Sequence, residues 1–182
     1  MIRKCIAAFG LALAPMPAAA ITLEDLKDVS LETRSVYDAT IRRAEGTFTG
    51  QTTAVMTFRV DAEGRIRGNV TRTVNTPFGP RSKSYPMFAR IGQPGEPRVG
   101  GHGLWLLEGD KLVLLRTLEQ GGFKIEIEFK GSGKSMTCTA RAPFVREEGS
   151  TEIKTQESVV GGPVTFLKAT EKSTKCRVIR QF

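Results

Sequence analysis

The sequence predicts an all-β protein: an antiparallel up-and-down barrel, or a barrel-like sandwich, of about eight to ten strands with one short N-terminal helical turn. Three observations predict it. Residues 123–130 (FKIEIEFK) alternate strictly between large apolar and charged side chains, the period of a strand with one dry and one wet face. Similar runs recur about every ten to twelve residues, and short glycine-containing turns separate many of them. We prefer a closed or nearly closed barrel, because closure removes exposed strand edges.

Residues 1–20 are predicted to be a secretory signal peptide. They begin with two basic residues, continue as an apolar run over 5–13 and end in small residues at Ala20, the pattern of a cleavable leader. The run is too short to span a membrane. We therefore expect a periplasmic or secreted protein that is cleaved near Ala20 and does not span the membrane. The net charge of +8 falls to +6 when the two basic residues are lost.

Residues 21–182 are predicted to form a single all-β domain. Thr22 can cap a helical turn in which Asp25 occupies the third position. Strands are expected next over 35–43, 51–60 and 65–74, and the last two form a hairpin.

Residues 75–103 interrupt this pattern with five prolines and six glycines. They predict a long loop, which is either a functional excursion or contains an irregular edge strand over 84–91. Further strands are expected over 104–107, 111–118, 123–130, 135–142, 153–160, 164–169 and 175–182.

The inward-facing apolar side chains of these strands form the predicted core, and burying each one contributes about 1.5–3 kcal/mol before entropy is subtracted. The predicted core residues are Phe58, Trp105, Leu112, Leu114, Phe123, Ile125, Ile127 and Phe129.

Two cysteines, Cys138 and Cys176, remain once the leader is removed. An even pair in an oxidising compartment is a disulfide by default, whereas a redox-active pair usually has C-x-x-C spacing. We predict a disulfide that ties an inner strand to the C-terminal strand.

Groups for catalysis or metal binding are scarce. His102 is the only histidine and lies in a glycine-rich stretch, without a serine or cysteine motif beside it. The G-K-S of 133–135 lacks the first glycine of a P-loop and joins two predicted strands, so we interpret it as a hairpin turn. The sequence therefore predicts no catalytic residue, no metal site and no cofactor.

The segment 64–95 contains six basic side chains and no acidic one. A concentrated basic face attracts polyanions, and in an exported protein these would be anionic glycans, lipid headgroups or an acidic partner. Nucleic acid is not expected, since the aromatic interleaving of single-strand binders is thin. Plain solubility is the alternative interpretation. The candidate anion-binding residues are Arg65, Arg67, Arg72, Arg81, Lys83 and Arg90.

Several features resemble an uncharacterised family of small exported bacterial all-β proteins, which have a signal peptide, a meander of strands and two late cysteines. These features are Leu23-Leu26-Lys27 in an L-x-x-L segment, Thr33-Arg34, the strands of 111–130, Cys138-Thr139-Ala140 and Cys176. The resemblance implies an exported all-β fold without an assigned activity. Gly103-Leu104-Trp105 is similar to the G-x-W of lipocalins, but its place past the midpoint makes that likeness architectural only.

Three classes of function are compatible with the sequence. The first is a non-enzymatic binding module that holds an apolar small ligand or an envelope protein. The second is a polyanion or envelope-surface binder that uses the basic 64–95 segment. The third is a hydrolase, and it ranks last because no set of residues in the sequence requires an active site.

Overall fold

The computed structural model describes residues 20–43, 46–76, 79–92, 104–115, 121–146, 153–155 and 164–179. Its elements are α1 (Leu23–Leu26), β1 (Ser30–Arg43), β2 (Gly46–Val60), β3 (Arg65–Thr76), β4 (Gly79–Gly92), β5 (Leu104–Glu108), β6 (Lys111–Leu115), β7 (Gly121–Lys130), the 3₁₀ turn η1 (Gly133–Ser135), β8 (Thr137–Arg141), β9 (Phe144–Arg146), β10 (Ile153–Thr155) and β11 (Val164–Ile179).

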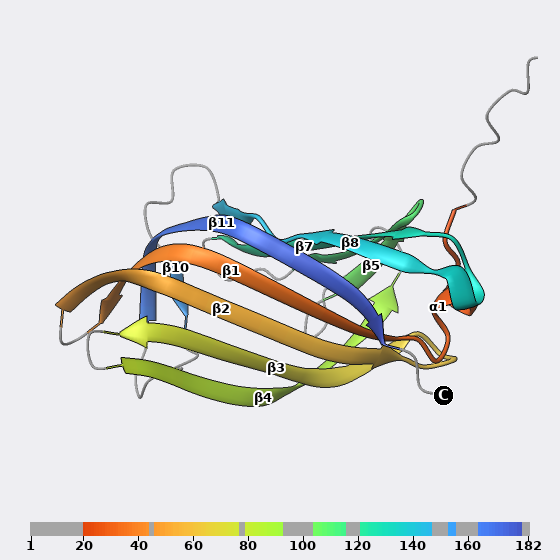
Figure 1. Cartoon of the computed structure of the whole chain (residues 1–182), viewed down its shortest axis with the longest axis horizontal. Coiled ribbons are helices and arrows are strands. Elements are labelled where there is room, and N and C mark those ends of the chain that lie inside the picture. The colour runs from red at the N-terminus through yellow and green to blue at the C-terminus, as the bar shows by residue number, and fades with distance from the viewer. Residues whose placement is uncertain are drawn as a thin grey trace, which may run out of the picture.

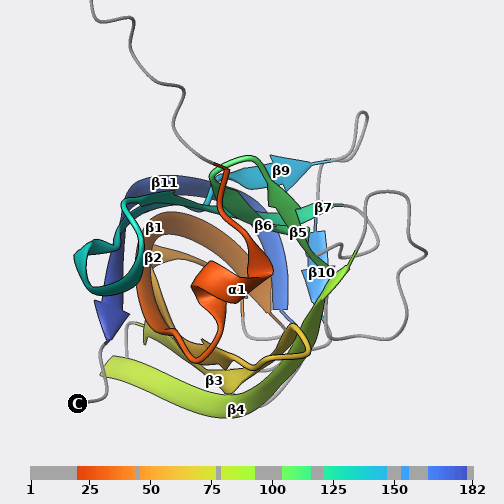
Figure 2. The same cartoon turned by 90° about the vertical axis from the view of Figure 1, so that its right-hand side faces the viewer.

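One sheet dominates the structure (Figure 1). Its strands follow the order β10-β11-β1-β2-β3-β4-β5-β6-β7-β8, and β9 pairs separately with β7. Strand β8 comes to lie beside β11, so the sheet curls into a nearly closed barrel (Figure 2). The predicted all-β barrel is thus confirmed, and so is the hairpin of 51–60 with 65–74.

One pair of strands departs from a strictly antiparallel meander. Strands β4 and β5 run parallel, and they pair over the three residues Arg90–Gly92 of β4. A parallel pair requires the chain to return to the end of the sheet from which it started. Residues 93–103 make that connection and lie outside the described residues.

Of the two interpretations of 75–103, the strand over 84–91 is confirmed and is longer than expected, whereas a loop is wrong for residues 75–76 and 79–92. Strand β4 pairs with β3 from Gly79 to Arg90. Pro80 and Pro86 are six residues apart, so their missing N–H groups lie on the same edge of the strand. One edge of β4 pairs with β3, and the proline nitrogens lie on the other edge. Among the described strands, β5 pairs with that other edge only from Arg90 onward. Proline is tolerated in β4 because that stretch has one strand partner rather than two.

The two C-terminal strands expected over 164–169 and 175–182 are one strand, β11, up to Ile179. Its pairing with β1 shifts register twice, between Val36 and Tyr37 and between Thr40 and Ile41. A bulge adds a residue to one strand and so changes which side chains face inward. The strict alternation of inward and outward side chains therefore breaks within β11. This break explains why the sequence pattern predicted two strands instead of one.

The larger core cluster lies at the end of the barrel that α1 covers (Figure 2). Thr22 and Asp25 form the capping box of α1. Leu26, the last residue of α1, is fully buried. The rings of Phe58 and Trp105 meet there, 5.2 Å apart at their centroids. Of the predicted core residues, Phe58, Trp105, Leu112, Leu114, Ile125, Ile127 and Phe129 are buried. The side chain of Phe123 lies outside those described.

The predicted disulfide joins Cys138 on β8 to Cys176 on β11. In the described residues β8 forms its backbone ladder with β7, and β11 forms its ladders with β1 and β10. Side-chain links therefore close the barrel between β8 and β11. Besides the disulfide, the Ala142 N–H donates to Glu171 Oε1 over 2.9 Å, and Tyr37 Oη donates to the Ala142 carbonyl over 2.9 Å. We call this junction the β8–β11 seam.

Candidate functional site

The six candidate anion-binding residues do not share one surface. On β3, Ile66 and Val70 are buried in the core, so even-numbered side chains of β3 face the barrel interior and odd-numbered ones face outward. Strand pairing carries this assignment across to β4. The outward residues are Arg65, Arg67 and Arg90, and the residues on the inward side are Arg72, Arg81 and Lys83.

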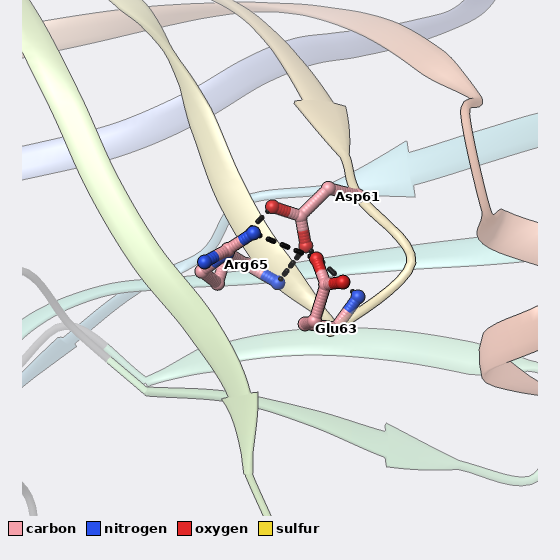
Figure 3. A network of polar contacts seen from close by, with 3 residues as sticks. All are labelled: Asp61, Glu63 and Arg65. Atoms are coloured by element: carbon pink, nitrogen blue, oxygen red, sulfur yellow. Dashed lines mark hydrogen bonds and ion pairs between the residues drawn. The ribbon is translucent and has the colours of Figure 1, made fainter.

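Arg65 is already occupied by contacts within its own turn (Figure 3). Its Nε lies 2.7 Å from Asp61 Oδ2 and its Nη2 lies 2.7 Å from Glu63 Oε2. Partial desolvation of Asp61 opposes ionisation, but the hydrogen bonds from Arg65 outweigh it and lower the pKa of the Asp61 carboxyl. The same hydrogen bond with Asp61 is the main cause that raises the pKa of Arg65. These contacts make Arg65 part of the β2–β3 turn rather than a residue that awaits a ligand.

Arg67 lies in the middle of an exposed row on the convex face. Arg59 of β2 stands directly opposite it on one side, and Phe88 of β4 stands opposite it on the other. The Phe88 side chain is 50 % exposed. Arg59 is bonded to Asp28 over 2.7 Å. We call Arg59, Arg67, Phe88 and Arg90 the outer arginine surface.

Arg59 and Phe88 were not among the residues singled out from the sequence. The signal for Phe88 was available in principle, because it has the same parity as Arg90 along the chain. It was missed because 84–91 was expected at most as an irregular edge strand, and the alternation of side chains along it was not followed.

The inward basic residues belong to two neighbouring rows that cross five strands. One row runs Thr174, Ser35, Ala54, Arg72 and Lys83, and the next runs Glu171, Tyr37, Thr52, Val74 and Arg81. We call Arg72, Arg81 and Lys83 the inner basic group. These rows lie where the larger core cluster, which includes Tyr37, meets a smaller one that consists of Ala39, Ile41, Val74 and Phe166.

Polar contacts order the β1–β11 side of these rows. Ser35 and Thr52 are 4 % and 6 % exposed. Thr174 Oγ1 lies 3.1 Å from Ser35 Oγ and is also hydrogen-bonded to Glu171 Oε1. Burial raises the pKa of the Tyr37 hydroxyl well above its ordinary value; Glu171 adds to the rise, and Ser35 and Arg72 oppose it. Tyr37 is therefore neutral across the physiological pH range, and its hydroxyl can donate to the Ala142 carbonyl at the seam.

Solvent reaches the β3–β4 side of the same rows. Arg72 is partly buried, with its guanidinium carbon 5.8 Å from the centroid of the Tyr85 ring. Arg81 and Lys83 are exposed although they lie on the inward side of the sheet. The concave face is thus open to water where the inner basic group lies.

The remaining features of the sequence do not add a site. His102 lies outside the described residues. Residues 133–135 form the turn η1 between the paired strands β7 and β8, which confirms their interpretation as a hairpin turn. The described residues contain no group of three or more His, Cys, Asp or Glu side chains that could hold a metal ion. None of their helices is both long and apolar enough to cross a membrane.

Comparisons with protein-family models, with curated proteins and with solved structures gave no match. The fold and the two surfaces themselves define the class: an all-β barrel, closed at one seam by a disulfide, with arginines on its convex face and a second basic group on its concave face.

Proposed function

We propose that this protein is an exported, non-enzymatic binding barrel that attaches to an anionic, phosphate-bearing surface of the cell envelope through the outer arginine surface. The predicted signal peptide over 1–20 and the Cys138–Cys176 disulfide support export, since disulfides persist in oxidising compartments. The leader itself lies outside the described residues.

The observation that carries the proposal is the row Arg59, Arg67 and Phe88 on adjacent strands. Like charges directly opposite each other destabilise a sheet, so the Arg59–Arg67 pair costs stability. A half-exposed phenylalanine beside them adds apolar surface to the cations. Arginine binds phosphate oxygens with two parallel hydrogen bonds, and an exposed phenylalanine can be buried at the boundary between headgroups and acyl chains. The combination is typical of a protein that lies on an anionic membrane.

The barrel interior at the α1 end supports an apolar ligand less well. Trp105, Phe58, Leu26 and Leu31 are essentially inaccessible to solvent there, and α1 covers that end of the barrel (Figure 2). Side chains rather than a ligand therefore supply the apolar contacts of this half of the interior.

Sedimentation with vesicles tests the proposal. The full mature protein should bind vesicles that contain phosphatidylglycerol and should not bind phosphatidylcholine vesicles. Arg67→Ser should weaken binding about fivefold at low salt, because a basic side chain near an anionic surface contributes about 1 kcal/mol. Phe88→Ser should also weaken binding to the anionic vesicles, because it removes the exposed ring.

Lys130→Ser is the matched control, since Lys130 is an exposed cation on the outward side of β7, opposite the neutral Thr137. It should change binding much less than Arg67→Ser. Equal losses would mean that net charge alone drives attachment. Absence of binding to the anionic vesicles would refute the proposal.

A further inference from the structure

We propose that removal of the leader completes the fold, because the new amino group of Ile21 fastens α1 over its end of the barrel. Small residues at 18–20 match an A-x-A cleavage site that ends at Ala20. Hydrolysis of the Ala20–Ile21 peptide bond by a leader peptidase consumes one water, leaves a carboxylate on Ala20 and creates an α-ammonium group on Ile21. This maturation step requires the export proposed above, but it does not involve the outer arginine surface.

Ala20 and Ile21 differ in their surroundings. Ala20 is exposed, whereas Ile21 is partly buried and packs against the larger core cluster. The Ile21 N–H donates to the Gly109 carbonyl over 2.9 Å, in the turn between β5 and β6. A cut directly before Ile21 therefore removes the exposed side of the bond and leaves the docked side in place.

α1 depends on anchors at its two ends. It has a single turn of four residues, which is too short to be stable alone. After the turn, the Asp28 N–H donates to the Val60 carbonyl over 2.9 Å, and the Val60 N–H donates to the Val29 carbonyl over 3.2 Å. Before the turn, the chain is held by the hydrogen bond from Ile21 to Gly109 and by the apolar packing of Ile21. The amino end of Ile21 is therefore the place where processing can change how firmly α1 is held.

The new positive charge has suitable neighbours. Before the cut, the Ile21 nitrogen is a neutral amide with one hydrogen to donate, and afterwards it is a cation with three. A charge-assisted hydrogen bond is roughly twice as strong as a neutral one. Glu108 and Asp110 flank Gly109 in the accepting turn. Two acidic residues also occupy the first turn of α1, and they offset the unfavourable effect of a cation near a helix N-terminus.

Two measurements test this step. The first is the intact mass of the protein that a bacterial host secretes with its own leader, and the expected mature chain begins at Ile21. The second compares two chains released from cleavable fusions, one that begins at Ile21 and one that retains Ala20. In the chain that retains Ala20, the Ile21 nitrogen is a neutral amide again. The chain that begins at Ile21 should unfold at a temperature about 2–4 °C higher.

Substitutions in the accepting turn separate the effect of charge from the effect of chain length. Glu108→Gln/Asp110→Asn should lower the unfolding temperature of the chain that begins at Ile21, and it should affect the chain that retains Ala20 less. Three results would overturn the proposal: a mature chain that begins elsewhere, equal unfolding temperatures of the two chains, or an equal effect of the double substitution on both. Failure of secretion and processing would overturn both this step and the proposed export. The vesicle assay on the chain that begins at Ile21 would still decide the outer arginine surface by itself.

Discussion

Loss of the Cys138–Cys176 disulfide should open the barrel locally at the β8–β11 seam. The bond joins two strands that lie side by side, yet each forms its backbone ladder with another neighbour in the described structure. Ala142, the residue after β8, is also hydrogen-bonded to Glu171 of β11 and to Tyr37 of β1. The disulfide is the covalent link of this junction, so its loss should weaken the junction most.

The size of the effect follows from the length of the loop that the bond closes. The two cysteines are 38 residues apart. The chain-entropy model gives about 4 kcal/mol of stabilisation at 25 °C for a loop of this length. Small domains are stable by only about 5–15 kcal/mol in total, so the reduced protein should lose a large share of its unfolding free energy.

Two measurements check this prediction. Urea unfolding of the oxidised wild type and of the Cys138→Ser/Cys176→Ser variant should differ by about 3–5 kcal/mol, and reductant should affect only the wild type. Amide hydrogen exchange of the variant should accelerate in β8 and in the facing part of β11, while β2 and β3 stay protected. A difference below about 1 kcal/mol, or equal acceleration in every strand, would show that the seam does not depend on the disulfide.

Three further predictions concern single side chains. Tyr37→Phe leaves the Ala142 carbonyl without its donor and should lower the unfolding free energy by about 1–2 kcal/mol in urea. Because the folded-state pKa of Tyr37 is raised, wild-type stability should also decline as the pH rises above about 10, and an identical decline in Tyr37→Phe would contradict this assignment. In Gly68→Ala the new Cβ would lie 2.1 Å from the Thr57 carbonyl oxygen and 2.6 Å from the Phe58 Cα. The cost should be about 1–3 kcal/mol or more by thermal unfolding, and the reasoning is wrong if Gly109→Ala, which has open space but a φ of +64°, costs more. The pKa of Glu126 is lowered by hydrogen bonds from Lys124 and Arg141, so Glu126→Gln should cost less than about 1 kcal/mol at pH 7. That difference should shrink as the pH falls below the unfolded-state pKa of about 4.3 and should vanish below the lowered folded-state pKa of Glu126; a difference that does not shrink as the solution is acidified would count against an ionic origin.

Local alternation of side chains was enough to predict the fold class, since Phe123–Lys130 and the 51–74 hairpin can only be half-buried strands. It was not enough where composition outweighed pattern. The prolines and glycines after Thr76 indicated a loop. In the structure Pro80 and Pro86 are part of β4, and their backbone nitrogens face away from β3, on the edge that pairs with β5 only from Arg90 onward. The bulges opposite Tyr37 and Ile41 depend on pairing between distant strands, which no local window contains.

For the candidate site too, the sequence showed the local features, and the features that depend on pairing between strands required the structure. The concentration of charge in 64–95 was visible in the sequence, but its separation into two groups required the parity of β3 to be followed through β4. Arg65 and Arg67 are odd-numbered and Arg72 is even-numbered, so the hairpin pattern alone already separates them. Only the register shows that Lys83 faces Arg72 and that Phe88 faces Arg67.

The two basic groups differ in a way that bears on whether either is merely a solubility device. A solubility device needs exposed charge, and it gains nothing from cations that stand directly opposite each other, because that arrangement costs stability. Both groups contain such a pair: Arg59 with Arg67 on the convex face and Arg72 with Lys83 on the concave face. On the convex face Asp28 offsets part of the repulsion. On the concave face the register sets Arg72 and Lys83 directly opposite each other. A pair of cations at such a position is a cost to the sheet that solubility alone does not require.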